Sequence, residues 1–233
     1  MKNREKIMNH FLKCSENTLI SVGRVYEQHF SDSMSRDAFM KTISRLYKDG
    51  EIERLSKGIY CLPKNTKFGK LLPSDKDILL YYTSGNRGVM IGYGLYNSLG
   101  ISTQIPKHLI AYSSLSEEEY KQVRNVIVHK YLIDYSEKNK AIIRLMELLY
   151  HFKEIQDINL LTFLQCLENL SKEYSEDAFE TVQRAVGYPK WTIAFLQEVL
   201  NYYKLTNSLQ KYLSVFSNYK IPRIEELYEI ARR

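Results

Sequence analysis

The side chains best suited to chemistry recur along residues 36–48 at spacings of three and four, which places them on one face of a helix. Arginine pairs with guanine through two hydrogen bonds, serine reaches bases or phosphates, and lysine neutralises phosphate charge. The pattern therefore favours recognition of double-stranded DNA. The solvated surface helix of any domain can show the same pattern, and this alternative stays open. The residues of the face are Asp37, Lys41, Ser44, Arg45 and Lys48.

Three short amphipathic helices are expected to position this face. Ser21 and Ser35 are suitable N-caps for the second and third helices. Arg36 follows Ser35 at the N-terminal end of the third helix. In a recognition helix, this end contacts base edges in the major groove. Helices this short need one another to be stable, so we expect a helix-turn-helix arrangement. The expected apolar stripes are Ile7, Met8, Phe11 and Leu12, then Val22, Val25, Tyr26 and Phe30, then Phe39, Ile43, Leu46 and Tyr47.

A β-hairpin is expected directly after these helices. Gly50 is typical of a helix end, and residues 51–55 and 59–63 are rich in residues that favour strands. The connection of residues 56–58 places Gly58 where the turn needs a positive φ. Arg54 and Lys57 would carry this hairpin to the DNA backbone or the minor groove. Three helices and a hairpin are the elements of a winged helix.

The following segment, residues 63–75, holds two prolines, a glycine and three lysines without clear periodicity, so we interpret it as the domain boundary. Lys64, Lys67 and Lys70 are as typical of an exposed linker as of contacts with DNA.

The distribution of charge also places a DNA-binding function in the N-terminal part of the chain. Residues 1–70 carry 14 Lys and Arg against 8 Asp and Glu, whereas residues 71–233 carry 19 of each. This asymmetry favours a polyanionic partner for the N-terminal part.

Two separated blocks of sequence resemble the abortive-infection antitoxin family AbiEi. The first contains Ser44-Arg45-Leu46 and then the pattern Gly-x-Ile-x-Arg-Leu-x-x-Gly-x-Tyr from Gly50 to Tyr60. The second is Leu99-Gly100-Ile101-Ser102-Thr103-Gln104-Ile105-Pro106, which is similar to a Leu-Gly-Leu-Ser-Thr-Gln-Val-Pro turn of that family. On the helix before it, this chain carries Tyr93, Tyr96 and Asn97 where family members often carry small residues.

The resemblance implies an α+β, mainly α fold with a winged helix-turn-helix over residues 1–66 and an antitoxin domain over residues 67–233. Strands and short helices are expected to about residue 135 and helices beyond, the last near residues 190–216. The implied function is that of a type IV antitoxin active in abortive infection and phage defence. Such an antitoxin represses its own promoter, which we expect to contain inverted repeats, and counteracts a nucleotidyltransferase-like toxin. The implied DNA contacts are Ser35, Arg36, Lys41, Ser44, Arg45, Lys48, Arg54 and Lys57.

Other classes of function have little support in the sequence. Cys14, Cys61 and Cys166 are widely separated, and the five histidines form no metal or catalytic motif, so we expect no metal, no cofactor and no enzymatic activity. No continuous apolar run reaches the length of a membrane helix, so we expect a cytoplasmic protein without a membrane partner. Two alternatives remain: a stand-alone winged-helix regulator with a ligand-sensing C-terminal domain, and a nucleic-acid enzyme that uses one of its acidic pairs.

Overall fold

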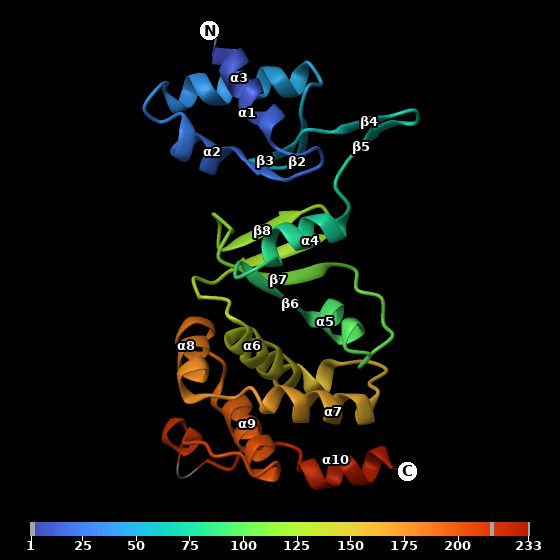
Figure 1. The fold of residues 1–233 in the computed structure, drawn as a ribbon. Coiled ribbons are helices and arrows are strands. Elements are labelled where there is room, and N and C mark those ends of the chain that lie inside the picture. The colour runs from blue at the N-terminus through green and yellow to red at the C-terminus, as the bar shows by residue number, and fades with distance from the viewer. Residues whose placement is uncertain (1–2, 215–216, 233) are drawn as a thin grey trace. The chain divides into compact units, whose positions relative to one another are not determined.

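The computed structural model describes residues 3–214 and 217–232. Within them the fold is α+β and mainly α, as expected (Figure 1). The chain forms two units, residues 1–81 with 122–126, and residues 82–121 with 127–233. The division after residue 81 lies later than the boundary expected at residues 66 and 67. The first unit begins with α1 (Asn3–Lys13), β1 (Ile20–Ser21), α2 (Val22–His29), α3 (Arg36–Lys48), β2 (Glu53–Ser56), β3 (Ile59–Cys61), β4 (Lys64–Thr66), β5 (Gly69–Leu71) and α4 (Asp75–Thr83), whose last two residues belong to the second unit.

The first unit packs its three N-terminal helices and a small antiparallel sheet around one core. The sheet has the order β1-β3-β2, with Ile20 opposite Tyr60 and Arg54 opposite Tyr60 on the other side. Leu12, which was expected in the apolar stripe of α1, is 58% exposed because it lies on the outer side of the helix. The buried core consists of Ile7, Phe11, Ile20, Val22, Phe30, Phe39, Ile43, Leu46, Ile52 and Tyr60.

Local signals account for the ends of these elements. The hydroxyls of Ser21 and Ser35 accept hydrogen bonds from the backbone N–H groups of Arg24 and Ala38, so both predicted N-caps are confirmed. Gly50 follows the end of α3 with a φ of 74°, a conformation that is costly for residues with a Cβ atom. Gly58, in the turn between β2 and β3, has a φ of 77°. The hairpin is present, although a register shift at Leu55 leaves only Lys57 and Gly58 between the strands.

The lysine-rich segment after this hairpin is not an irregular linker. Residues 64–71 form a second hairpin, in which Lys64 pairs with Leu71 and Thr66 with Gly69. Every residue of β4 and β5 is exposed, and the two strands make a sheet of their own. The segment interpreted as the domain boundary, residues 63–75, thus contains a paired hairpin in its first half, and the first unit continues beyond it to residue 81. With only three residues in each strand, the pairing leaves no periodicity in the sequence that would distinguish it from a linker.

The second unit combines a helical layer with a four-stranded sheet, of which residues 122–126 at the ends of β8 and β9 are grouped with the first unit. The sheet has the order β6-β7-β9-β8, and β6 and β7 pair from Gly88 opposite Ser113 to Ile91 opposite Ile110. Gly88 has no space for a side chain, since an added Cβ atom would lie 2.3 Å from the carbonyl oxygen of Tyr112. The elements are β6 (Gly88–Ile91), α5 (Gly92–Ser98), β7 (Leu109–Ser113), β8 (Tyr120–Val123), β9 (Val126–Lys130), α6 (Glu137–Tyr150), the 3-10 helix η1 (Phe152–Glu154), α7 (Leu160–Ser171), α8 (Glu176–Val186), α9 (Lys190–Tyr202), the 3-10 helix η2 (Leu209–Tyr212) and α10 (Ile224–Ala231).

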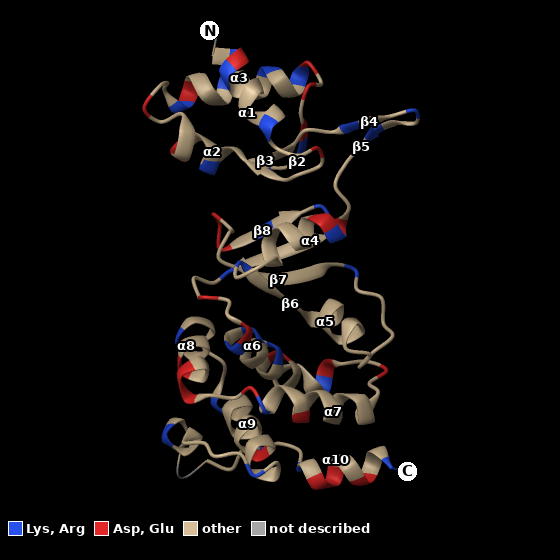
Figure 2. Ribbon diagram, viewed as in Figure 1, with Lys and Arg blue, Asp and Glu red and all other residues tan. Residues whose placement is uncertain are grey.

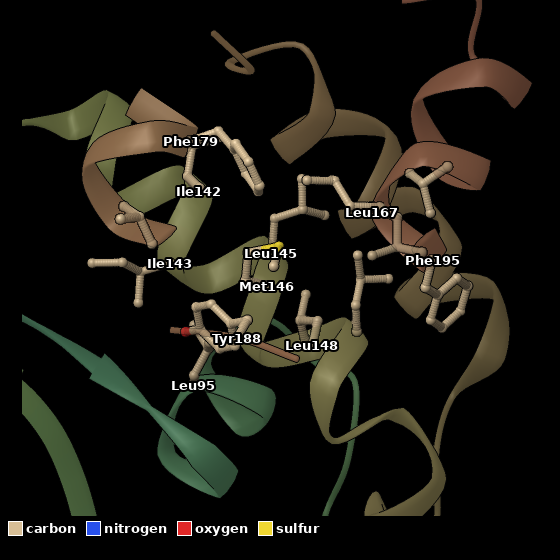
Figure 3. Close-up of a cluster of buried hydrophobic side chains, with 14 of the residues drawn as sticks. Leu95, Ile142, Ile143, Leu145, Met146, Leu148, Leu167, Phe179, Tyr188 and Phe195 are labelled. Atoms are coloured by element: carbon tan, nitrogen blue, oxygen red, sulfur yellow. The ribbon is translucent and has the colours of Figure 1, made fainter. Parts of the chain in front are cut away.

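Helix α6 is the centre of this unit. It packs against α7, α8 and α9, and its side chains Ile142, Leu145 and Leu148 are fully buried among theirs (Figure 3). The last expected helix is shorter than predicted. It ends at Tyr202, and Lys204 adopts a left-handed φ of 57°, while residues 215 and 216 of the expected range lie outside the described residues. No helix of the described residues is long and apolar enough to cross a membrane.

Candidate functional site

The outer face of α3 is open to solvent along its whole length. Lys41, Ser44, Arg45 and Lys48 are all exposed, and the helix geometry places them on the side opposite Phe39. Figure 2 shows lysine and arginine distributed along α3. The structure therefore brings these four predicted residues together. Asp37 shares the face in the first turn, where a carboxylate interacts favourably with the helix dipole.

The two predicted residues at the start of α3 are placed differently. The Ser35 hydroxyl caps the helix by accepting a hydrogen bond from Ala38. Arg36 lies about 60° around the helix from Phe39, on the flank rather than at the centre of the face. Its guanidinium is 3.9 Å from the carboxylate of Glu27 on α2, and both side chains are about two-thirds exposed at 67% and 63%. A pair this exposed is weak, so Arg36 remains accessible to a ligand.

Acidic residues near the end of α3 are paired with cations outside the face. Asp49 and Glu51 both form ion pairs with Arg4 of α1, and Glu53 of β2 lies 2.6 Å from Lys70. The hydrogen bonds from the Arg4 guanidinium to Asp49 and Glu51 raise its pKa. Within the described residues, by contrast, Lys41, Arg45 and Lys48 form no ion pair. These three cations are therefore not held in ion pairs, and Asp37 is the acidic residue that shares their face.

The β2–β3 hairpin holds the two other predicted cations. Arg54 is exposed on β2, and its Nε donates to the carbonyl oxygen of Ser56 at 3.4 Å. Lys57 is exposed in the turn. The turn is fixed to α2, because the N–H of Val22 donates to the carbonyl oxygen of Gly58 at 3.0 Å. The hairpin is thus held along its β3 side, by β1 and by the start of α2.

Tyr47 was assigned to the buried stripe of α3, and that prediction was wrong. Its side chain is 43% exposed, and its ring meets the ring of Tyr60 in β3 edge to face at 6.3 Å. Tyr47 therefore lies between the α3 face and the hairpin, and Met40, 39% exposed, flanks the same face. Counting 100° per residue places Tyr47 about 80° around the helix from Phe39, at the limit of the buried stripe. This angle was the signal in the sequence that Tyr47 could be exposed.

The second unit contains a buried carboxylate that the sequence did not single out. Glu147 on α6 is 1% exposed, and its Oε1 accepts hydrogen bonds from the hydroxyls of Tyr112 at 2.9 Å and Tyr188 at 2.6 Å. Its Oε2 has no hydrogen-bond partner within the described residues and lies 3.7 Å from Nε2 of His151. His151 also contacts Glu154 through Nδ1 at 2.7 Å. Burial raises the pKa of Glu147, although the two tyrosine hydrogen bonds and His151 oppose this effect.

Glu147 lines a cavity of about 350 Å³ whose walls also include Tyr93, Tyr96 and His108. Nδ1 of His108 is buried and, like Oε2 of Glu147, has no hydrogen-bond partner in the part of the chain that the structure describes. A cavity with two such polar atoms fits a small ligand that forms hydrogen bonds, or ordered water. The described residues contain no group of three or more His, Cys, Asp and Glu side chains arranged to hold a metal ion.

The turn that resembles the second AbiEi block adjoins this cavity through Pro106. The hydroxyl of Ser102 donates to the carbonyl oxygen of Gln156 at 2.8 Å and accepts from the N–H of Gln104. Gln104 also bonds to Asp157, and its carbonyl oxygen accepts from Asn97 at 2.9 Å. These contacts connect the turn to the loop after η1. The block has a structural role in positioning the segment that carries His151 and Glu154.

Comparison with known proteins identifies a family but no activity. The Rv2827c protein from Mycobacterium tuberculosis is a distantly similar solved structure, with 10% sequence identity, a TM-score of 0.43, and coverage of 88% of this chain and 82% of that one. No curated protein is significantly similar to the chain. A family of unknown function, DUF6088, matches residues 20–149, which extend from β1 to near the end of α6. Because this match covers more than half of its residues, the chain belongs to the family of unknown function DUF6088.

Proposed function

We propose that the N-terminal unit is a winged helix that binds double-stranded DNA, with α3 in the major groove and the β2–β3 hairpin at the adjacent backbone. The observation that carries the proposal is the exposed face of α3. Its Lys41, Arg45 and Lys48 form no ion pair within the described residues, whereas Asp49, Glu51 and Glu53 are paired with Arg4 and Lys70. Cations without an acidic partner remain available to contact phosphates and base edges. Ser44 adds a hydrogen-bonding group between them.

The resemblance to AbiEi extends this proposal to a biological role. The chain acts as a cytoplasmic antitoxin of a type IV system and represses its own promoter through the first unit. The second unit counteracts a nucleotidyltransferase-like toxin, either by contact or by reversing its effect, and the role needs no catalytic step by this chain. The two sequence blocks support this role, because one forms α3 and its hairpin and the other forms an ordered turn of the second unit.

Replacing Arg45 by alanine tests the DNA-binding face. We expect Arg45→Ala to weaken binding to the DNA upstream of the chain's own gene by about 1–3 kcal/mol and to relax sequence preference, if Arg45 contacts a base. If Arg45 contacts only phosphate, the slope of log affinity against log salt falls by about one. The measurement is equilibrium binding to labelled promoter duplex over a salt series, with unrelated duplex as competitor.

Arg184→Ala is a matched control, because Arg184 is also an exposed arginine in the last turn of a helix, α8 of the second unit. This variant should bind the promoter like wild type. Equal binding by wild type and Arg45→Ala, with both folded, would show that the recognition face is misassigned. Loss of all promoter binding in the presence of competitor duplex would reject autorepression itself.

A second candidate function rests on the cavity beside Glu147. A regulator whose second unit senses a small molecule would bind it through Oε2 of Glu147 and Nδ1 of His108, which have no hydrogen-bond partner among the described residues. In this case a protein-free extract of small molecules from the host cells should change promoter binding by wild type. Glu147→Gln should bind DNA normally and lose the response. The antitoxin proposal instead expects no response in either protein and a toxin gene beside this one.

A further inference from the structure

The β4–β5 hairpin presents an exposed aromatic ring at its tip. Phe68 is 100% exposed, and it is followed by Gly69 with a φ of 110°. Phenylalanine has a large apolar surface that water solvates poorly, so complete exposure on an ordered turn needs an explanation beyond stability. Figure 1 shows the hairpin extending away from the three helices of its own unit.

Hydrogen bonds within the turn fix the backbone that carries the ring. The hydroxyl of Thr66 donates to the carbonyl oxygen of Gly69 at 2.7 Å and accepts from the N–H of Phe68 at 3.2 Å. One side chain thereby closes the turn from both directions. The tip is therefore preorganised, and a ligand that meets Phe68 need not first order the backbone.

The base of the hairpin is fixed to the proposed DNA-binding elements of the same unit. Nζ of Lys70 donates to the carbonyl oxygen of Gly50 at 2.8 Å and to Glu53 at 2.6 Å, which connects β5 to the end of α3 and to β2. On the other strand, the N–H of Lys64 donates to the side chain of Asn17 at 3.2 Å. Lys70 is thus an anchor, although its side chain is exposed like those of Lys64 and Lys67.

The charge and the low intrinsic stability of the hairpin indicate the kind of ligand that it binds. Residues 64–71 contain three lysines and no acidic residue. A two-stranded hairpin is marginal in water without a packed face, and this one buries none of its strand residues. A polyanion would neutralise the charge of the lysines, and stacked bases would remove the Phe68 ring from water. Each strand of three residues spans roughly 10 Å, whereas the minor groove is about 7.5 Å deep. The hairpin is therefore long enough to bring the Phe68 ring to the base pairs.

We propose that the β4–β5 hairpin is an arm that enters the DNA minor groove beside the major groove occupied by α3, and that Phe68 wedges between two base pairs and kinks the duplex. Apolar side chains inserted from the minor groove unstack a base step and bend DNA in this way. Lys67 would contact the flanking phosphates. This inference rests on the proposed DNA binding of α3, and it adds a second, shape-dependent contact, which favours flexible pyrimidine–purine steps in the promoter.

The test is DNA bending by the full-length protein. A promoter duplex labelled at both ends reports the bend by energy transfer, and 2-aminopurine placed at successive steps reports unstacking. We expect wild type to shorten the end-to-end distance and to raise 2-aminopurine fluorescence at one step. Phe68→Ala should abolish both signals and weaken binding about tenfold, equivalent to roughly 1.4 kcal/mol. Phe68→Leu should retain the bend, because leucine also acts as a wedge.

Ile105→Ala is the control, since Ile105 is 91% exposed in the second unit and should leave bending unchanged. Promoter binding without any bend, or bending by Phe68→Ala equal to that by wild type, would overturn the arm and leave the α3 proposal intact. A change of oligomeric state in Phe68→Ala with an unaltered bend would assign the ring to contact between copies and would also overturn it. Absence of promoter binding by wild type would instead reject the proposed function.

Discussion

At the scale of single residues, the N-terminal unit separates its charges into two groups. Arg4 and Lys70 are used within the protein, where they bind Asp49, Glu51 and Glu53. The cations on the outer face of α3 are exposed without such partners in the described residues. Exposed ion pairs contribute little to stability, so the significance of the first group is mainly electrostatic: it removes negative charge from the region that would face phosphate.

The buried carboxylate of Glu147 should make the free energy of unfolding depend on pH. Burial gives this group a higher pKa in the folded state than in the unfolded chain, so the folded state binds its proton more tightly. The stability that Glu147 contributes is therefore present below the unfolded value near 4.5 and is lost as pH rises through the folded pKa. We expect the free energy of unfolding of wild type to fall, relative to that of Glu147→Gln, as pH rises above the unfolded value near 4.5. Each tenfold difference in proton affinity accounts for about 1.4 kcal/mol.

Urea unfolding at several pH values measures this difference. Trp191, the single tryptophan, stacks on Tyr150 in the second unit, so its fluorescence follows the unit that holds Glu147. Glu168→Gln serves as the control, because Glu168 is a partly exposed carboxylate, 43% accessible, paired with Lys172. A difference between wild type and Glu147→Gln that is the same at every pH would contradict the assignment of a raised pKa.

At the scale of elements, short connections determine where the proposed DNA-binding surfaces lie. The end of α3, the β2–β3 hairpin and the β4–β5 hairpin meet near Gly50, whose carbonyl oxygen accepts the hydrogen bond from Lys70. The φ of Gly50 allows α3 to stop and the chain to turn into β2. An added Cβ atom at this position would lie 3.2 Å from Nζ of Lys70. One residue thus controls both the helix end and the anchor of the second hairpin.

Gly50→Ala and Gly58→Ala form a matched pair of substitutions. Both glycines have left-handed φ values, so each alanine variant should lose about 1–2 kcal/mol of folding free energy. Only Gly50→Ala crowds another residue, since an added Cβ atom at Gly58 has no atom within 4 Å. We therefore expect similar losses of stability by urea unfolding, and a reduced DNA bend for Gly50→Ala alone. Equal bending by the two variants would show that Lys70 does not fix the arm.

At the scale of the whole molecule, the chain consists of two units with separate cores. The charge follows this division, because the excess of Lys and Arg lies in residues 1–70 and the remainder is balanced. The proposed roles follow it as well: DNA binding belongs to the first unit and neutralisation of the toxin to the second. Variants of the full chain test this division without disturbing either core.

Combining Arg45→Ala with Lys57→Ala should separate the two proposed activities. We expect this double variant to lose repression of a promoter reporter, because two phosphate or base contacts are removed, while it still rescues cells that express the neighbouring toxin gene. Reporter output and colony counts measure the two activities in the same strain, with Arg184→Ala as the control that retains both. Failure of rescue by a folded double variant would show that neutralisation needs the DNA-binding unit.

The features that could be predicted from the sequence are local, with signals that lie within a few residues. The N-caps Ser21 and Ser35, the end of α3 at Gly50, the positive φ of Gly58 and the polar face from Lys41 to Lys48 were all predictable, because capping, turn geometry and helical period depend on near neighbours. Tertiary structure decided the remainder. Lys70 became an anchor through Gly50 and Glu53, Tyr47 became exposed beside Tyr60, and Glu147 became buried between two tyrosines distant in the chain. Such contacts join positions whose distance in space no local pattern encodes, and burial and charge pairing depend on that distance.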